Sequence, residues 1–197
     1  QKIVEQIREQ SGNQQIELVV GDLSLCRDQD KVINEINSKR YPVDILINNA
    51  GALYRERELT EEGLERSFAL LLLSPWRLTE GLLPSLRRSK GARVINVVSG
   101  GMYSQKLHLD DLQFANERYN GPAAYARAKR GLMELTRRWA SEWEKDGIAV
   151  NAMHPGWADT PGVRSSLPGF YKLTRPILRT AAEGADTIVW LAAASEA

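Results

Sequence analysis

The sequence is poor in the residues that build disulfides or metal sites. It contains one cysteine, Cys26, and two histidines, His108 and His154, among 197 residues. A single thiol excludes an internal disulfide framework, so we expect a reducing intracellular compartment. One cysteine and two histidines far apart do not give the ligand spacing of a zinc site, and we expect no metal.

Long apolar runs and an excess of charge of one sign are also absent. The longest apolar run, residues 68–75, is far shorter than the roughly 20 residues that a membrane-spanning helix needs. Lys plus Arg number 26 and Asp plus Glu 25, which gives a net charge of +1. This balance gives no reason to expect nucleic acid or an anionic membrane as the main partner. Because the chain begins with Gln1, no targeting segment can be read from it.

What is present fits one folded domain, residues 1–197. Hydrophobic residues make up 43% of the chain, enough to bury a core. Helical apolar spacing alternates with short apolar runs that are typical of buried strands. The predicted helices are 2–10, 28–40 with Asp28 as N-cap, 60–89, 122–145 and 181–194, the predicted strands are 16–23, 44–51, 92–99 and 148–156, and residues 158–178 are predicted as a loop.

This alternation predicts an α/β fold, with a doubly wound, Rossmann-type parallel sheet covered by helices on both faces. Such sheets bind ligands beyond the carboxyl ends of their strands. The polar and small residues that follow the predicted strands are Asp22-Leu23, Asn48 to Gly51, Ser99 and Pro155-Gly156. We therefore expect a ligand site at that edge of the sheet.

Tyr125 and Lys129 lie four residues apart in a predicted helix, which puts both side chains on one face. A phenol has an ordinary pKa near 10, and a nearby ammonium favours phenolate, as an acid-base group needs. The alternative is an exposed pair on the helix surface. Ser99 ends a predicted strand and its hydroxyl can reach a substrate oxygen, or it is simply a turn residue.

In order and spacing these residues resemble the short-chain dehydrogenase/reductase family. The resemblance covers essentially the whole chain. The motifs that carry it are Asn48-Asn49-Ala50-Gly51, Ser99, Tyr125-x-x-x-Lys129 and Pro155-Gly156-x-x-x-Thr160.

The resemblance implies a role for each of these residues. Tyr125 would exchange a proton with a carbonyl or alcohol, Lys129 would lower its pKa and bind the nicotinamide ribose, and Ser99 would orient the substrate oxygen. The cofactor would be NADP or NAD, which the sequence does not distinguish. The implied cofactor-binding residues are Asp22 and Leu23 beside the adenine, Asn49, Ala50 and Gly51 at the strand end, and Pro155, Gly156, Trp157 and Thr160 at the nicotinamide end, together with Tyr125 and Lys129.

The chain departs from the family pattern at its two ends. The family's TGxxxGxG turn, its first two strands and its last strand have no counterpart here, and we expect a fragment. In the strand order 3-2-1-4-5-6, residues 16–23 would then be stranded from the sheet or would form a new edge contact with residues 44–51. We expect weak dinucleotide binding and an exposed sheet edge prone to association.

A second departure lies in the long helix. Where the family has F-x-x-N-x-x-G, the sequence has Leu71 at the Asn position and Ser74 at the Gly position. Pro75 has no N–H, so an α-helix would leave the carbonyl of Leu71 without a donor. We expect that carbonyl to accept a relay water near Lys129, the alternative being that Pro75 only kinks the helix.

Apolar and aromatic residues near the site leave two interpretations open. Trp157, Val163, Leu167 and Phe170 would form the wall of a pocket for a lipophilic alcohol or carbonyl, or they are ordinary loop packing. The pair Trp139 and Trp143 is read as core or as a helix–helix interface. In the family the two long helices build dimer contacts, so the resemblance implies a homo-oligomer.

The sequence therefore indicates an oxidoreductase that interconverts a small-molecule alcohol and a carbonyl by hydride transfer with NAD(P), with Tyr125 as acid-base residue. The main alternative is a non-catalytic binding or interaction protein on a truncated Rossmann fold. A sugar-nucleotide epimerase, which shares the Tyr-x-x-x-Lys pair, fits the Asn-Asn-Ala-Gly segment less well.

Overall fold

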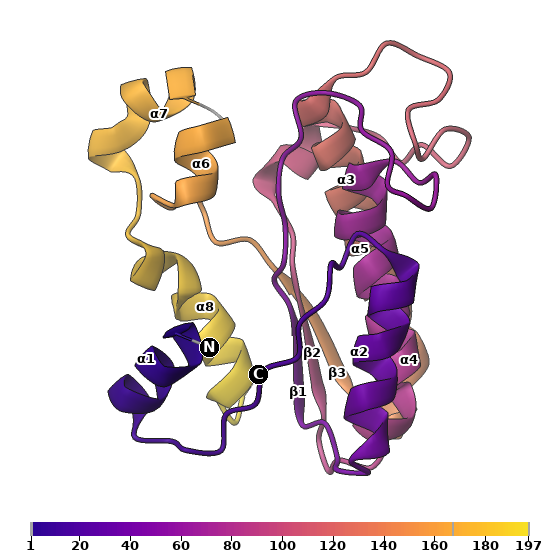
Figure 1. The fold of residues 1–197 in the computed structure, drawn as a ribbon, viewed down its shortest axis with the longest axis vertical. Coiled ribbons are helices and arrows are strands. Elements are labelled where there is room, and N and C mark those ends of the chain that lie inside the picture. The colour runs from indigo at the N-terminus through magenta and orange to yellow at the C-terminus, as the bar shows by residue number, and fades with distance from the viewer. Residues whose placement is uncertain (1, 167, 197) are drawn as a thin grey trace.

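The fold is a parallel three-stranded sheet with helices on both faces (Figure 1). The structure is a computed structural model that describes residues 2–166 and 168–196. Strands β1 (Ile45–Asn48), β2 (Arg93–Val97) and β3 (Ala149–Met153) lie side by side in that order. Each pair is parallel, as the near-continuous apolar runs predict. The predicted α/β class is confirmed.

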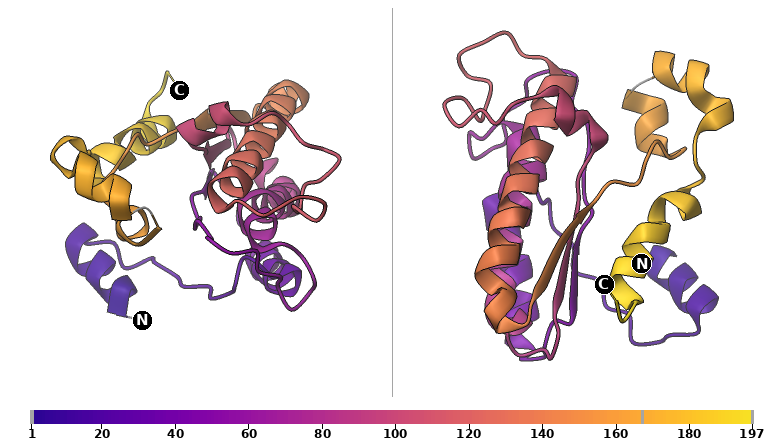
Figure 2. Two further views of the ribbon diagram at one scale, coloured as in Figure 1. Left: turned by 90° about the horizontal axis from the view of Figure 1, so that it is seen from above. Right: turned by 180° about the vertical axis from the view of Figure 1, so that it is seen from behind.

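The helices divide unequally between the two faces of the sheet. Helices α4 and α5 cover one face and α2 packs on α4, while α8 covers part of the other face (Figure 2). The helices are α1 (Lys2–Ser11), α2 (Cys26–Ser38), α3 (Arg66–Phe68), α4 (Ser74–Leu86), α5 (Gly121–Trp143), α6 (Pro161–Ser166), α7 (Pro168–Thr174) and α8 (Ala181–Ala193), with a π-helix, η1 (Ala69–Leu73), and the 3-10 turns η2 (Gly100–Ser104), η3 (Glu144–Asp146) and η4 (Arg175–Ile177).

The predicted strand at residues 16–23 is wrong. Residues 12–22 have no regular secondary structure, and Leu18 and Val20 are 49% and 69% exposed. In the sheet that the structure describes, β1 pairs only with β2, so this apolar stretch has no strand beside it. A strand needs a neighbour to satisfy its backbone N–H and C=O groups. Of the two expectations for this stretch, separation from the sheet is confirmed.

The long predicted helix 60–89 begins later and is broken into segments. The buried Glu65 carboxylate caps the true start by accepting hydrogen bonds from the backbone N–H groups of Ser67 (2.8 Å) and Phe68 (2.7 Å). The next turn is the π-helix η1, where Ser74 N–H bonds to the Ala69 carbonyl. If this pattern of bonds to the fifth residue back continued, the missing N–H of Pro75 would leave the carbonyl of Leu70, rather than that of Leu71, without a donor.

Two other local predictions were wrong. Helix α2 starts at Cys26 rather than after Asp28, and the carboxylate of Glu62 accepts hydrogen bonds from the N–H groups of Cys26 (2.6 Å) and Arg27 (3.0 Å). A side chain 36 residues away along the chain thus caps this helix. The predicted loop 158–178 contains the short helices α6, α7 and η4.

Within the described residues, no helix combines the length and apolarity needed to cross a bilayer.

The main core lies between the sheet and helices α4 and α5. Trp139 and Trp143 are 1% and 5% exposed, and their rings stack with centroids 5.4 Å apart. The indole N–H of Trp139 donates to Glu80 Oε1 at 2.8 Å. This aromatic pair is therefore core rather than an external interface.

A buried chain of polar side chains crosses this core. Asn48 Nδ2 donates to Thr79 Oγ1 (2.9 Å) on α4 and to Asn96 Oδ1 (2.8 Å) on β2. Asn96 Nδ2 donates in turn to Thr136 Oγ1 (2.9 Å) on α5. Asn48 and Asn96 are directly paired in the parallel register. The chain ties two strands to two helices immediately below the carboxyl edge of the sheet.

Candidate active site

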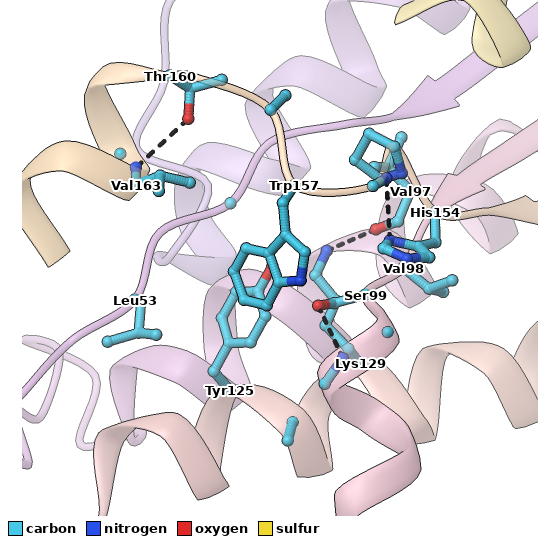
Figure 3. A pocket seen from close by; sticks show the side chains of 18 of the residues that line it. Leu53, Val97, Val98, Ser99, Tyr125, Lys129, His154, Trp157, Thr160 and Val163 are labelled. Atoms are coloured by element: carbon cyan, nitrogen blue, oxygen red, sulfur yellow. Dashed lines mark hydrogen bonds between the residues drawn. The ribbon is translucent and has the colours of Figure 1, made fainter. Parts of the chain in front are cut away.

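A cavity of about 510 Å³ lies at the carboxyl ends of the three strands (Figure 3). Its walls come from the segments after β1, β2 and β3 and from the first turns of α5. The sequence-predicted residues that line it are Asn49, Gly51, Ser99, Tyr125, Lys129, Pro155, Gly156, Trp157 and Thr160. The three residues of the proposed acid-base set thus converge on one opening at the predicted edge.

Three predicted cofactor-binding residues, Asp22, Leu23 and Ala50, do not line this cavity. Asp22 lies just before α2, where its carboxylate accepts hydrogen bonds from the backbone N–H (2.8 Å) and hydroxyl (2.7 Å) of Ser24. These bonds lower the pKa of Asp22. A role for these three residues in binding a cofactor stays a prediction.

Helix α5 carries Tyr125 and Lys129 to the cavity. Its N-cap is Asn120, whose side chain accepts a hydrogen bond from the N–H of Ala123 at 3.0 Å. A Cβ atom added at Gly121 would lie 2.1 Å from the carbonyl oxygen of Tyr54, so the loop after β1 touches the helix start. This close approach brings the end of β1 and the first turns of α5 together.

Lys129 is buried and bonded to the sheet. Lys129 is only 2% exposed, and its Nζ donates to the carbonyl oxygen of Val97 at 2.7 Å. Burial disfavours the charged ammonium and lowers the pKa of Lys129 to about 8. Nζ lies 5.9 Å from the centroid of the Tyr125 ring. The one formally cationic group on the cavity lining of the described residues is therefore held against the end of β2.

In this arrangement Lys129 does not offset the burial of Tyr125, and its effect on the phenol stays a prediction. Burial raises the pKa of Tyr125, and hydrogen bonding to the Ser99 side chain only partly opposes that rise. The physical reason is that a buried phenolate loses hydration while the Lys129 ammonium is bonded to the Val97 carbonyl. In this arrangement Tyr125 is a neutral phenol that can donate a proton.

Ser99 sits where β2 ends and the turn η2 begins. Its Oγ accepts a hydrogen bond from the backbone N–H of Gly101 at 3.3 Å, which fixes the hydroxyl oxygen at the cavity wall. An oxygen that accepts this bond still has its own O–H to donate. The Ser99 side chain hydrogen-bonds to Tyr125, so a substrate oxygen bound between the two would have to take over that O–H.

Two glycines in the cavity wall allow close packing. A Cβ atom at Gly51 would lie 3.2 Å from Leu71 Cδ2 and 3.8 Å from Lys129 Nζ, so the missing side chain lets these two side chains approach the strand end. Gly156 has a φ of +75°, which other residues rarely adopt, and the Arg179 side chain packs against it.

His154 also lines the cavity, although no motif in the sequence singled it out. Its Nδ1 accepts a hydrogen bond from the backbone N–H of Gly156 at 3.2 Å, so the neutral ring carries its proton on Nε2. Nε2 lies 3.0 Å from the position of a Cβ added at Gly100. The signal in the sequence was its position at the end of a strand, next to Pro155.

The remaining wall is apolar. Leu53, Val97, Val98, Trp157 and Val163 line the cavity, and its described lining includes no Asp, Glu or Arg. Of the predicted wall residues, Trp157 and Val163 are present, whereas Leu167 and the side chain of Phe170 lie outside the described residues. Within the part of the chain that the structure describes, no group of three or more His, Cys, Asp or Glu side chains is placed to hold a metal ion.

The family follows from comparison with known proteins. The sequence profile described as short chain dehydrogenase matches residues 1–169. The chain therefore belongs to the short-chain dehydrogenase family, and the resemblance seen in the motifs is confirmed.

Individual relatives give a closer comparison. The chain is 45% identical over 192 residues to dehydrogenase/reductase SDR family member 12 of Bos taurus, covering 98% of this chain and 60% of that protein. It is 34% identical over 207 positions to polyprenol dehydrogenase of Danio rerio, covering 98% and 62%. The chain thus spans about three fifths of the length of these curated relatives.

A solved structure supports the fold. The L-sorbose reductase of Gluconobacter frateurii, complexed with NADPH and L-sorbose, superimposes with a TM-score of 0.74 at 24% identity, covering 98% of this chain and 75% of that one. The match establishes a Rossmann-type short-chain dehydrogenase fold.

Proposed function

We propose that this chain forms the catalytic half of an oxidoreductase that interconverts a lipophilic alcohol and a carbonyl by hydride transfer with NADP or NAD. The observation that carries the proposal is the convergence of Ser99, Tyr125 and Lys129 on one cavity in a member of this family. A hydroxyl donor, a phenol and an amine around one opening are the groups that carbonyl reduction requires.

The cofactor assignment rests on the shape of the strand ends. Gly51 and Lys129 both line the cavity at the end of β1 and β2, where a backbone without a side chain and an amine suit a nicotinamide ring and its ribose. When bound, the nicotinamide group supplies or accepts the hydride. The residues proposed to hold its nicotinamide end are Asn49, Gly51, Tyr125, Lys129, Pro155, Gly156, Trp157 and Thr160, and those proposed for more distant parts are Asp22, Leu23 and Ala50.

In the reducing direction Tyr125 would donate its phenol proton to the substrate oxygen. The raised pKa of Tyr125 keeps the phenol protonated at neutral pH, which suits this direction. The Ser99 O–H would donate a second hydrogen bond to the same oxygen and stabilise the negative charge that develops on it. In the oxidising direction Tyr125 would accept the proton of the alcohol.

Lys129 would act on the phenol through its charge. In the structure its ammonium is bonded to Val97, so this role requires Nζ to exchange that carbonyl for a partner nearer to Tyr125. A relay water at the carbonyl of Leu71 stays part of the proposal. The Leu71 side chain and Lys129 Nζ both lie near Gly51, but continued π-type pairing would leave the carbonyl of Leu70, rather than that of Leu71, without a donor.

The substrate class is inferred from the cavity wall. An apolar lining without Asp, Glu or Arg favours an uncharged, lipophilic alcohol or carbonyl. The name of one relative, polyprenol dehydrogenase, describes an enzyme of that kind and supports the assignment.

Assembly through the two long helices is a further expectation. Because Trp139 and Trp143 are buried in the core, an interface on α4 would have to use exposed residues such as Trp76. A homo-oligomer that associates there should dissociate in the variant Trp76→Glu.

The test is turnover of a panel of lipophilic aldehydes and ketones with NADPH and NADH. We expect reduction by the wild-type chain and its loss in Tyr125→Phe, with cofactor binding retained in a titration. Folded protein that binds the cofactor but reduces no carbonyl, with the same behaviour in Tyr125→Phe, would overturn the enzymatic proposal. That outcome would assign the chain to the non-catalytic binding proteins.

A further inference from the structure

The segment that follows the cavity, residues 168–177, leaves large apolar side chains in water. Leu173 is 83% exposed and Ile177 is 81% exposed, more than any other large apolar side chain among the described residues. They lie four residues apart, Leu173 in α7 and Ile177 in η4. Figures 1 and 2 show α7 standing away from the sheet in every view. Exposed apolar side chains grouped in this way are typical of an interaction surface.

The same part of the chain is strongly basic. Between residues 161 and 182 the sequence contains four basic residues and no acidic residue, although the net charge of the whole chain is only +1. Lys172 and Arg175 are both exposed and flank Leu173. The overall charge balance therefore conceals a local cationic segment.

This segment is held in place by contacts at its inner end. Arg164 Nε lies 2.6 Å from Asp159 Oδ1, and the Arg164 guanidinium lies over the ring of Tyr171 at 5.6 Å. These contacts join the loop after β3, α6 and α7. The ion pair occupies Arg164, so the cationic charge on the outer side comes from Lys172 and Arg175.

The segment is also continuous with the cavity. Thr160, Gly162 and Val163 line the cavity, and the last two belong to α6, the helix that precedes α7 in the chain. A molecule bound to α7 thus contacts a segment that is close in sequence to residues of the cavity wall. A lipophilic substrate would need such a route, because its solubility in water is low.

We propose that residues 168–177 dock the protein on an anionic lipid bilayer, from which a lipophilic substrate reaches the cavity. Leu173 and Ile177 insert among the acyl chains, while Lys172 and Arg175 bind anionic headgroups. The supply of substrate rests on the proposed function, whereas the attachment to the bilayer does not.

The test is co-sedimentation of the full chain with phosphatidylcholine vesicles, with and without phosphatidylserine, in the absence of cofactor and substrate. We expect binding that requires phosphatidylserine and weakens with added salt. Lys172→Gln and Arg175→Gln should each weaken binding about five-fold, which corresponds to about 1 kcal/mol per basic residue. The double variant Leu173→Asp/Ile177→Asp should not bind.

Matched controls separate docking from general effects. Leu109→Asp replaces an equally exposed leucine on another loop, and Lys145→Gln removes an exposed charge from η3. Both should bind vesicles like the wild type. Because the replaced side chains are exposed, circular dichroism and the thermal midpoint should be unchanged in every variant.

Two results would overturn the proposal. One is that the wild-type chain does not bind vesicles, or that the four substitutions in the segment do not change its binding. The other is unchanged vesicle binding together with a raised KM for a water-soluble ketone, which would make Leu173 and Ile177 a cover for the substrate. Vesicle binding is measured without cofactor or substrate. Failure to detect the proposed oxidoreductase activity would therefore not change the outcome of this test.

Discussion

The ammonium of Lys129 donates to the backbone carbonyl of Val97 at 2.7 Å, while its nitrogen stays 5.9 Å from the centre of the Tyr125 ring. The amine is thus bonded to the end of β2 rather than to the phenol. This arrangement explains why burial dominates both groups, lowering the pKa of Lys129 to about 8 and raising that of Tyr125.

The first prediction concerns stability and pH at Lys129. The folded protein releases the Lys129 proton near pH 8, whereas the unfolded chain keeps it until about pH 10.5. The unfolded state therefore binds more protons than the folded state between these values. As a result, the free energy of unfolding increases as pH rises through this window. The full change is about 3 kcal/mol.

Urea unfolding of wild type and Lys129→Met at pH 7 and pH 10 measures this effect. We expect the methionine variant to be relatively more stable at pH 7 and to lose that advantage by pH 10. Lys145→Met, on the exposed turn η3, serves as the control. A stability difference between wild type and Lys129→Met that does not change with pH would contradict the buried-ammonium argument.

The second prediction concerns Ser99. Ser99→Ala removes the donor to the developing oxyanion and should lower kcat about a hundred- to a thousand-fold. Ser99→Thr keeps a hydroxyl and should restore much of the activity. Both are measured as steady-state reduction of one aldehyde at saturating cofactor. Equal activity in wild type and Ser99→Ala would show that the hydroxyl does not contact the reacting oxygen.

The third prediction concerns the tryptophan stack. Trp139 is almost fully buried and stacks on Trp143. Trp139→Ala should lower the free energy of unfolding by about 3–5 kcal/mol, because it leaves a cavity and removes the hydrogen bond from the indole to Glu80. Trp76→Ala replaces a partly exposed tryptophan on α4 and should cost much less. If urea unfolding shows similar losses in the free energy of unfolding at both positions, Trp139 is not a main contributor to the core.

The fourth prediction concerns the buried asparagine pair. Asn48→Ala or Asn96→Ala leaves its partner with one unmade hydrogen bond and should cost about 1–3 kcal/mol. The double variant should cost less than the sum of the two, because the partners are then removed together. Denaturant unfolding of all four proteins gives the coupling. Strict additivity would mean that the two amides do not interact.

The strands were the part of the fold most readable from sequence. Residues 44–51, 92–99 and 148–156 each contain an observed strand, since a buried parallel strand is a nearly continuous apolar run. Residues 16–23 have the same composition and are not a strand. Whether an apolar run pairs depends on which strand lies beside it, and that information is not local.

Helix ends were harder to predict because their caps do not follow the usual local pattern. Glu62 caps α2 from a loop 36 residues away, and the buried Glu65 caps α3 while accepting a hydrogen bond from the hydroxyl of Tyr119. The first contact is long-range, and glutamate is not among the residues usually preferred at an N-cap. The predicted starts at Asp28 and at Thr60 followed local rules that these contacts override.

The strand-end motifs located most of the cavity lining, because parallel strands end at one edge. The partner of Lys129 could not be predicted in this way. A four-residue spacing shows that Tyr125 and Lys129 share a helix face, but it does not say which carbonyl a buried ammonium will meet. His154 was missed because a histidine beside Pro155 has an equally good structural explanation.

The tryptophan stack sits far along α5 from the reacting groups. Fourteen residues separate Tyr125 from Trp139, about 21 Å of helix at the usual rise per residue. The aromatic pair of the core and the residues that line the cavity therefore lie at different ends of α5. Cavity residues can be replaced one at a time while this aromatic pair is left in place.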